Sequence, residues 1–561
     1  MERFYKEIIR EIKKKGLSGK RLNNAKLKLC RKYGLSFVPT NIQILLNADK
    51  KDIRGLGIEA KPSRTVSGVA AIAVMAAPYA CPHGKCIYCP GGPGSSFGSV
   101  PQSYTGKEPA SRRAVRANFS AYLQVFNRLE QYMVSGHVAD KAELIIMGGT
   151  FPAMPRTYQK RFVAECFQAM NDFSKAFFRK NRFDIEKFKE FFELPGDFRD
   201  LGRIRRVHKK IFALKKKTTL GKEQSLNETA RIRCIGLTIE TRPDYATLKD
   251  ANFMLGLGCT RVEIGVQSVY DDVLRKINRG HTVKETISSF RALKDLGFKI
   301  NAHYMLGLPG SSEKKDLAGL GVLFRNSCFR PDMLKIYPCM VFRGTRLYSM
   351  WKKGKYRPMT TKQAAKVIAS FKSSIVPRYV RIMRVQRDIP TMFSEAGVDK
   401  TNLRQYVQQA MKAKKTRCRC IRCREAGRMG RKITVGIIKT TEYAASGGTE
   451  FFIEAADKNS DALIGYCRMR FPSAALRKEI SKDTAVIREV HIYAPLVGIG
   501  KKSGESLQHR GTGAKLIKEA ENMAARHKKK KMLVISGIGA RQYFRKFGYR
   551  KEGPYMSKKL G

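Results

Sequence analysis

The sequence has few acidic residues and no long apolar run. Only 47 of its 561 residues are Asp or Glu, against 110 Lys and Arg, so the formal net charge is +63. This shortage of acids leaves far more positive charge than solubility requires, which makes nucleic acid the expected partner and a membrane surface the second choice. No apolar run reaches the roughly 18 residues of a membrane span, and the first residues lack the apolar core of a signal peptide. We therefore expect a cytoplasmic protein that has no membrane partner.

The chain also lacks internal repeats and low-complexity linkers. Its length then allows three or four ordinary domains. The 13 cysteines gather in groups and are not spaced as a disulfide framework would be. In a cytosolic protein, grouped cysteines favour metal ligation over disulfides.

Three of these cysteines, Cys81, Cys86 and Cys89, lie in a loop rich in Pro and Gly with the spacing C-x4-C-x2-C. Three thiolates would hold a 4Fe-4S cluster with one iron left free. That iron can bind S-adenosylmethionine (SAM), which a reduced cluster cleaves to a 5'-deoxyadenosyl radical, while the protein supplies the geometry. Radical SAM loops usually have three residues where this loop has four, so on spacing alone a zinc knuckle or three unrelated thiols remain alternatives.

Apolar runs that alternate with helix-length segments predict a parallel α/β sheet. Strands are expected at 66–75, 143–147, 234–239, 261–266, 299–305 and 333–336, and helices at 112–133 and 283–296. This alternation predicts a parallel barrel, closed or partial, whose reactive groups lie at the carboxyl ends of the strands. The cysteine loop follows the first strand, which places the cluster at that end.

Two other strand ends carry candidate ligands. Gly148 and Gly149 form either a tight turn or bare backbone that can bind an amino-acid ligand. Glu240 and Arg242 form either an ion pair or a clamp on the ribose and carboxylate of SAM.

Two basic segments are candidates for contact with phosphates. Residues 1–36 hold twelve Lys or Arg and three Glu on a helical pattern that breaks at Gly16. The insertion 172–227 contains the stretch 203–217, with eight Lys or Arg and no acid. A solvated helical surface is the alternative for the first, and disorder is the alternative to a mobile phosphate-binding loop for the second.

A second thiol group is formed by Cys418, Cys420 and Cys423. Three thiols so close in sequence predict a metal site, and zinc requires four ligands. Cys339 is the candidate for the fourth, with water or His as the alternative ligand and iron as the alternative metal. The rest of 340–430 is expected to be a helical linker.

From about residue 432 the pattern becomes antiparallel. Strands are expected at 433–438, 450–454, 463–469 and 485–493, followed by a glycine loop at 508–514, a helix at 515–527, a strand at 532–536 and a helix at 541–546. Glycines that open a helix expose backbone N–H groups to phosphate. The loop and the order of elements fit the α+β fold of acetyltransferases that bind acetyl-CoA (GNAT type).

Several motifs carry a family resemblance. CPHGKC, MGGTF, GLTIETRPD, EIGVQSVYDDV, YMLGLPG, RVQRDIP, CRCIRC, QHRGTGAKL and ARQYFRKFGY occur in this order. The chain therefore closely resembles the catalytic subunit of Elongator in its stand-alone archaeal or bacterial form. The resemblance implies four parts: a basic tRNA-binding module at 1–65, a radical SAM domain at 66–338, a zinc-binding linker at 339–430 and a GNAT-type domain at 431–561.

The resemblance also implies an activity. It is a tRNA modification in which the wobble uridine gains a carboxymethyl group at C5, with the two carbons from acetyl-CoA and a radical from SAM. An unidentified electron donor is needed, and other Elongator subunits are not. The alternative is a protein lysine acetyltransferase, of histone type, whose iron-sulfur domain is structural.

Site residues follow from the same resemblance. The implied cluster ligands are Cys81, Cys86 and Cys89, the implied zinc ligands are Cys339, Cys418, Cys420 and Cys423, and the implied acetyl-CoA contacts are Lys141, Glu489, Val490, His491, Ile492, Thr512, Gly513, Ala514, Tyr543 and Phe544. The family often has a second Tyr where this chain has Phe544, so we expect Phe544 to be a packing contact.

Overall fold

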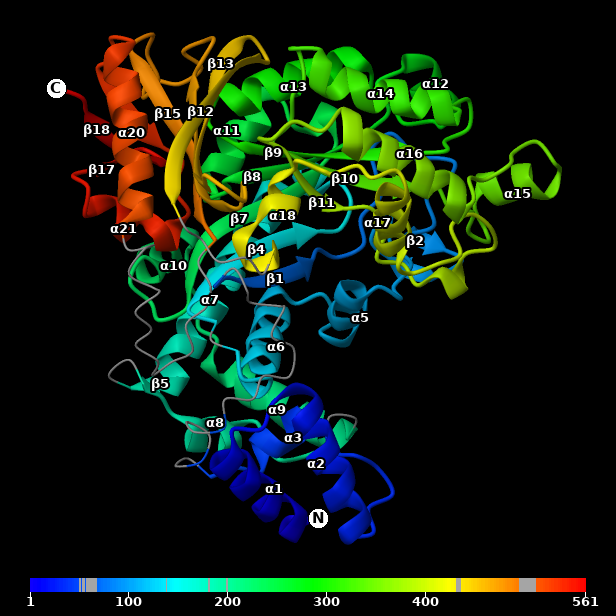
Figure 1. The fold of residues 1–561 in the computed structure, drawn as a ribbon, viewed down its shortest axis with the longest axis vertical. Coiled ribbons are helices and arrows are strands. Elements are labelled where there is room, and N and C mark those ends of the chain that lie inside the picture. The colour runs from blue at the N-terminus through cyan, green and yellow to red at the C-terminus, as the bar shows by residue number, and fades with distance from the viewer. Residues whose placement is uncertain are drawn as a thin grey trace.

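The structure is a computed structural model that describes residues 1–49, 52, 56, 68–137, 139–179, 182–197, 200–429, 435–493 and 511–561. Two seven-stranded sheets dominate these ranges, with a helical N-terminal module at one end (Figure 1). The predicted glycine loop lies outside them as far as Arg510, as do the predicted domain boundaries at 65/66 and 430/431. None of the described helices is long and apolar enough to cross a membrane.

The first sheet is parallel throughout and has the order β1-β4-β7-β8-β9-β10-β11. Its strands are β1 (Ala70–Met75), β4 (Lys141–Met147), β7 (Arg233–Thr241), β8 (Arg261–Gln267), β9 (Lys299–Leu306), β10 (Met333–Pro338) and β11 (Arg381–Arg384). The edge strands β1 and β11 are not paired with each other, so the sheet is a partial barrel. The six predicted strands are confirmed.

The seventh strand, β11, was predicted to be part of a helical linker, and that prediction is wrong. Its four residues, Arg-Ile-Met-Arg, include one buried side chain, Ile382. So short and polar a segment has no strand signature of its own, and it becomes a strand because β10 offers an open edge.

Helices cover the outer face of this sheet (Figure 1). Those that pack on its strands or on one another there are α5 (Pro109–Arg116), α6 (Ala121–Val134), α7 (Arg156–Phe177), α11 (Leu248–Gly256), α13 (Val283–Asp295), α14 (Glu313–Arg325) and α16 (Thr361–Ser374). The other elements of this part of the chain are α12 (Asp271–Lys276), α15 (Arg346–Lys352), α17 (Leu403–Ala413), α18 (Ile421–Arg424) and α19 (Ala426–Met429), with the short turns η2 (Phe151–Ala153), η3 (Pro243–Tyr245) and η4 (Thr391–Phe393). The helix predicted at 112–133 is two helices, because Asn118 and Phe119 adopt positive φ values of 45° and 55° between α5 and α6. Ser120 then caps α6 by accepting the Leu123 N–H.

The N-terminal module begins with two amphipathic helices, α1 (Glu2–Lys15) and α2 (Gly19–Lys32), followed by α3 (Asn41–Leu46). Gly16 ends α1 in the left-handed conformation at φ 59°, as the sequence predicts. Their apolar faces form a core of their own, so most basic side chains are left on the outside, while Lys26 is buried and donates to the Pro39 carbonyl.

The insertion is helical, and the prediction of a mobile loop or disorder is wrong for its described residues. It contains α8 (Ile185–Phe191), α9 (Leu201–Leu214) and α10 (Leu220–Asn227), with the short strands β5 (Phe178–Arg179) and β6 (Arg182–Phe183). Arg203 is buried and donates to the Phe192 carbonyl, while Arg206 and Lys210 pair with Glu193. Some of the basic residues of the insertion therefore bond to the protein itself and stabilise the packing of its helices.

The second sheet has the order β12-β13-β14-β15-β16-β18-β17. Its elements are β12 (Gly436–Ala445), β13 (Gly448–Asp457), β14 (Leu463–Phe471), β15 (Thr484–Ile492), α20 (Thr512–Arg526), β16 (Lys531–Val534), η6 (Ile538–Ala540), α21 (Arg541–Arg545), β17 (Arg550–Glu552) and β18 (Tyr555–Lys559). The antiparallel pattern is confirmed for β12 to β15, and the sequence missed only β17 and β18 among these strands. A separate hairpin, β2 (Gly92–Ser95) and β3 (Gly98–Val100), follows the cysteine loop.

Candidate active site

The three thiols of the first group lie beyond the carboxyl end of β1. Cys86 and Cys89 are buried, and Cys81 is half-buried. Arg279 Nη1 lies 3.6 Å from the Cys86 sulfur, and the Ser103 N–H donates to the Cys89 sulfur at 3.3 Å. A guanidinium and a backbone N–H directed at sulfur stabilise thiolates, which is the form that binds iron.

The spacing of the two thiol groups differs. Zn–S bonds of about 2.3 Å in a tetrahedron place the sulfurs about 3.8 Å apart. The sulfurs of Cys418, Cys420 and Cys423 all lie within 4.8 Å of one another, and no such close group of thiols forms around Cys81 in the described part of the chain. The second group thus has the spacing for a single ion, whereas the sulfurs of the first group do not all lie that close together.

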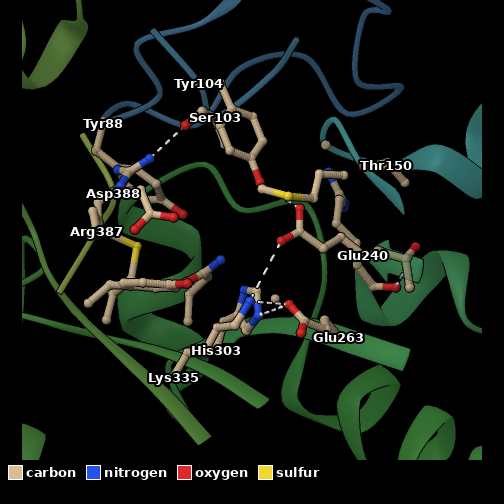
Figure 2. A pocket seen from close by; sticks show the side chains of 18 of the residues that line it. Tyr88, Ser103, Tyr104, Thr150, Glu240, Glu263, His303, Lys335, Arg387 and Asp388 are labelled. Carbon is tan, nitrogen blue, oxygen red and sulfur yellow. Dashed lines mark hydrogen bonds and ion pairs between the residues drawn. The ribbon is translucent and has the colours of Figure 1, made fainter. Parts of the chain in front are cut away.

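A cavity of about 130 Å³ opens beside Cys81 at the carboxyl edge of the first sheet (Figure 2). We call the residues nearest the thiols its rim: Cys81, Thr150, Arg242 and Arg279. We call the four residues on strands β7 to β10 its floor: Glu240, Glu263, His303 and Lys335. Both sets line the cavity, as do Gly149, Gln267, Tyr104 and Tyr337.

Three of the four predicted strand-end residues, Gly149, Glu240 and Arg242, line this cavity, and Gly148 directly precedes Gly149. Gly148 and Gly149 adopt φ values of 126° and 90°, and a Cβ on Gly149 would lie 2.9 Å from the Gln102 side chain. The close approach of the 101–104 loop therefore requires glycine there. Arg242 pairs with Asp244 at 2.7 Å, and its Nη1 is buried without a partner in the described structure. That nitrogen is available to a ligand carboxylate or hydroxyl.

Glu240 forms one wall of the floor. Tyr104 donates its phenolic proton to Glu240 Oε2 at 2.7 Å, and Lys335 Nζ lies 3.9 Å from Oε1. Burial raises the pKa of Glu240 to about 7, and the charge of Glu263 adds to the rise, while Lys335 and Tyr104 oppose it. Glu240 is thus a carboxyl group that can gain or lose a proton near neutral pH.

Glu263 holds the rest of the floor together. It accepts from Asn301 Nδ2 at 3.0 Å, lies 3.0 Å from His303 Nε2, and forms an ion pair with Lys335. Although burial opposes its charge, Lys335 and His303 keep the pKa of Glu263 well below its usual range. Burial and the charge of Lys335 lower the pKa of His303 to about 4, so His303 is neutral at pH 7.

The second sheet contains a separate cradle. Strands β15 and β16 pair in parallel only from Thr484 to Ile487, and β15 then continues to Ile492 paired with β14 on its other side. A Cβ on Gly513, in the first turn of α20, would lie 2.5 Å from the Tyr543 hydroxyl and 3.8 Å from Ile492. The structure therefore brings together Ile492, Gly513 and Tyr543, which sequence analysis assigned to one ligand. Thr512 and Ala514 flank Gly513 in the same turn.

The adjacent predicted residues differ in their environment. Phe544 is buried in the core of the second sheet, as expected of a packing contact, whereas Tyr543 is 40% exposed. Glu489 accepts from Arg468 at 3.0 Å, so its side chain is already paired. Its neighbour Val490 packs against the core of the second sheet, and His491 stacks on Tyr466. Contact of Glu489 and His491 with a ligand would therefore be through the backbone.

Lys141 lies at the opposite edge of the first sheet from the thiols, because it begins β4. Its partner across the strands is Arg233, and a Cβ on Gly539 would lie 2.4 Å from the Arg233 Cβ. Gly539 belongs to η6, directly before α21. Lys141 is exposed on the side of the sheet that faces the second domain.

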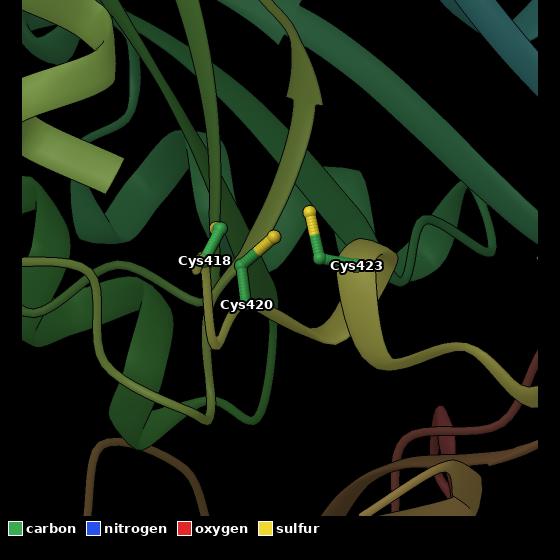
Figure 3. Close-up of side chains that lie close together, drawn as sticks. All are labelled: Cys418, Cys420 and Cys423. Carbon is green, nitrogen blue, oxygen red and sulfur yellow. The ribbon is translucent and has the colours of Figure 1, made fainter. Parts of the chain in front are cut away.

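The second thiol group does not include Cys339, so that prediction is wrong (Figure 3). Cys339 follows the carboxyl end of β10, and its N–H bonds the Leu306 carbonyl. Cys418, Cys420 and Cys423 lie near the other end of these strands, where the N–H of Ile421 bonds the carbonyl of Val380, just before β11. The length of a strand separates them. Lys372 Nζ lies 3.6 Å from the Cys423 sulfur and offsets the charge of the thiolates.

Comparisons with known proteins agree with this architecture. The ELP3 N-terminal domain matches residues 1–66, the Radical SAM superfamily matches 77–318, and the Radical_SAM C-terminal domain matches 331–413. The chain is 43% identical over 574 aligned positions to the tRNA uridine(34) acetyltransferase of Methanocaldococcus infernus, covering 100% of this chain and 99% of that relative. The chain belongs to the Elongator complex protein 3 family.

Two further relatives extend the comparison. Human Elongator complex protein 3 is 39% identical, with 96% of this chain and 93% of that protein covered. The solved structure of M. infernus Elp3 without its first 46 residues is 39% identical and superimposes with a TM-score of 0.71, covering 88% of this chain and all of that one. The match to the Radical SAM superfamily implies a 4Fe-4S cluster and SAM.

Sequence reasoning missed several residues that line the cavity of this Elongator complex protein 3 family member. They are Tyr104, Glu263, Lys335 and Arg279. A signal existed for two of them, because Glu263 and Lys335 interrupt otherwise apolar strand runs. A charged side chain inside a buried strand needs a partner of opposite charge. Glu263 therefore predicts a nearby cation and Lys335 a nearby anion, but the sequence does not say which residue each partner is.

Proposed function

We propose that the chain is a tRNA-modifying enzyme that forms 5-carboxymethyluridine at the wobble position from acetyl-CoA. The observation that carries the proposal is that three thiols and a charged cavity meet at the carboxyl edge of the first sheet. The cradle of Ile492, Gly513 and Tyr543 in the same chain supports a second cofactor site. The names of the relatives support a tRNA uridine as the substrate.

Cys81, Cys86 and Cys89 would hold the 4Fe-4S cluster, and Arg279 would balance the charge of its thiolates. When bound, the cluster and SAM supply a radical that can remove a hydrogen atom from the methyl group of acetyl-CoA. Arg242, with one free buried nitrogen, would bind the carboxylate of SAM. Gly149 leaves room for the loop that carries Tyr104 and so closes the cavity against water.

The second sheet would be a GNAT-type domain that binds acetyl-CoA. Strand β15 loses its partner β16 beyond Ile487, which leaves the backbone groups of 488–492 that do not pair with β14 available to an extended ligand. The N–H groups that open α20 at Thr512 would receive a phosphate. Cys418, Cys420 and Cys423 would hold zinc, with a water molecule or a residue still to be identified as the fourth ligand.

The test uses the purified protein with its cluster, a reductant, SAM, tRNA and acetyl-CoA deuterated at the methyl group. Mass spectrometry should find carboxymethyluridine in the tRNA and deuterium in 5'-deoxyadenosine. Cys86→Ala should abolish both and keep acetyl-CoA binding. Acetylation of a lysine peptide without either product would instead identify a protein acetyltransferase.

A further inference from the structure

Two groups on the cavity floor face each other with unused bonding capacity. Glu240 Oε1 and Lys335 Nζ are 3.9 Å apart, which is too long for a hydrogen bond. Tyr104 occupies only the other oxygen of Glu240. Lys335 has three protons, and Glu263 is its only hydrogen-bond acceptor among the described residues. The floor thus presents an acceptor beside a donor.

Such a pair matches a ligand edge that has a donor beside an acceptor. The imide edge of uracil has this arrangement, with N3–H next to the O4 carbonyl. The walls suit a flat ring as well, since Tyr104 and Tyr337 line the same cavity and Tyr337 meets His303 edge to face at 5.4 Å. Bases removed from a stack are held by aromatic faces and read along this edge.

The floor is separate from the part of the cavity next to the thiols. Glu240 and Glu263 are cross-strand partners inside β7 and β8, whereas Arg242 and Arg279 lie beyond the ends of those strands. Cys81, Thr150, Arg242 and Arg279 line the cavity together at the rim, and the Cys81 sulfur lies 3.5 Å from the Thr150 hydroxyl. A cofactor held at the rim by the thiols leaves the floor for the second reactant.

We propose that the floor is the subsite for the uracil ring, in which Glu240 accepts the N3–H and Lys335 donates to O4 (Figure 2). The assignment rests on the proposed function, because it takes the wobble uridine as substrate. Glu263 and His303 are positioning residues that fix the ammonium of Lys335. Cytosine, held by the same ribose, would place its amino group against Lys335 and its N3 lone pair against Glu240. At pH 8, where Glu240 is mostly ionised, each contact would then be repulsive, so the binding experiment is run at that pH.

The experiment measures binding of anticodon stem-loop RNA to the protein with its cluster, without reductant, by fluorescence anisotropy. Three RNAs differ only at the wobble base, which is uridine, cytidine or 3-methyluridine. The wild-type protein should bind the uridine RNA about ten- to a hundredfold more tightly than either of the others. The 3-methyl group removes the N3–H, so this comparison needs no protein variant.

Lys335→Met should lose much of the preference for uridine over cytidine and keep a preference over 3-methyluridine, whose methyl group still meets Glu240. Lys335→Arg should keep more of the preference over cytidine than Lys335→Met does. Lys366→Met, an exposed lysine on α16, is the matched control and should weaken all three RNAs equally or not at all. SAM binding, measured by equilibrium dialysis, should be the same in the wild type and in Lys335→Met. Thermal unfolding shows that the variants are folded.

Equal binding of the three RNAs to the wild-type protein would overturn the proposal. A Lys335→Met variant that keeps the full preference for uridine over cytidine would also overturn it. So would a Lys335→Met variant that loses SAM binding, because that result would assign Glu240 and Lys335 to the SAM site. Selective binding of uridine RNA without formation of carboxymethyluridine would refute the proposed function and leave this subsite intact. Carboxymethyluridine formed with unselective binding would refute only the subsite.

Discussion

Arg488, in β15 of the second sheet, donates to both carboxylate oxygens of Asp332, at 3.0 and 2.5 Å. Asp332 directly precedes β10 of the first sheet, so this pair joins the two domains. Lys294, Glu450 and Arg470 extend it into a network, and the side chains of all five are completely buried. The two domains are therefore fixed to each other through charges that water does not reach.

Removing one cation from this network should cost far more than removing a surface ion pair. Arg488→Met removes one of the two cations that Asp332 and Glu450 share, the other being Lys294, and we expect the free energy of unfolding to fall by about 3–5 kcal/mol. Arg526→Met breaks the exposed pair with Glu519 and should cost about 0–1 kcal/mol. Denaturant unfolding of both variants measures the difference. If the free energy of unfolding fell by similar amounts in both variants, the buried network would not be what stabilises the contact between the two domains.

Glu240 should make stability depend on pH. Its pKa rises from 4.5 to about 7 on folding, so between these values the folded protein keeps a proton that the unfolded chain has lost. Stability from this group is therefore present at low pH and lost as pH rises through that window, by on the order of 1–3 kcal/mol. Glu240→Gln should be stabilised relative to wild type at pH 8 and much less so at pH 5.

The matched control for this pH effect is Glu442→Gln on β12, whose side chain is exposed. Its difference from wild type should be the same at both pH values. Thermal unfolding followed by circular dichroism measures both variants. A Glu240→Gln difference that does not grow between pH 5 and pH 8 would contradict the buried, protonated carboxyl.

The zinc content should depend on Cys420, which belongs to the second thiol group, and not on Cys339. Cys420→Ser should lower the zinc content, since it removes one of three close thiols and structural zinc depends on each ligand. Cys339→Ser should retain full zinc because Cys339 lies at the opposite end of its strand from that group. Elemental analysis of purified protein gives the answer. Loss of zinc in the Cys339 variant would restore it as a ligand.

The N-terminal helices should contribute to RNA affinity through charge alone. Lys14, Arg21 and Lys28 are exposed, and none forms an ion pair with another residue in the ranges described. Changing all three to Gln should weaken tRNA binding and reduce the slope of log affinity against log salt by about one for each lost phosphate contact. The core of α1 and α2 is untouched, so this test avoids the unfolding that deletion of the helices risks.

A useful control for that triple variant is the change of Lys32 to Gln. Lys32 already pairs with Glu7 at 2.8 Å, so its loss should change the salt slope less than the loss of an unpaired lysine. If the slope of log affinity against log salt is unchanged in the triple variant, the basic residues of these helices are a solvated surface that does not contact RNA phosphates.

The sequence alone determined the local parts of this protein. Spacing placed Cys81, Cys86 and Cys89 after a strand, and apolar runs located six strands of the first sheet and five of the second. It also placed Gly149 and Glu240 at strand ends, because residues that follow a buried run lie at the carboxyl edge of a parallel sheet. These features depend on residues a few positions apart in the sequence, so the pattern of apolar residues predicts them directly.

Only the tertiary structure decided which distant residues meet. Glu263 and Lys335 are 72 positions apart, and only the order of strands β8, β9 and β10 brings their charges together. Cys339 shows the converse, since its chemistry fits zinc but its strand carries it away from Cys418, Cys420 and Cys423. Strand β11 exists because β10 leaves an edge to pair with. Register and strand order are set by packing of the whole sheet, and no local pattern encodes them.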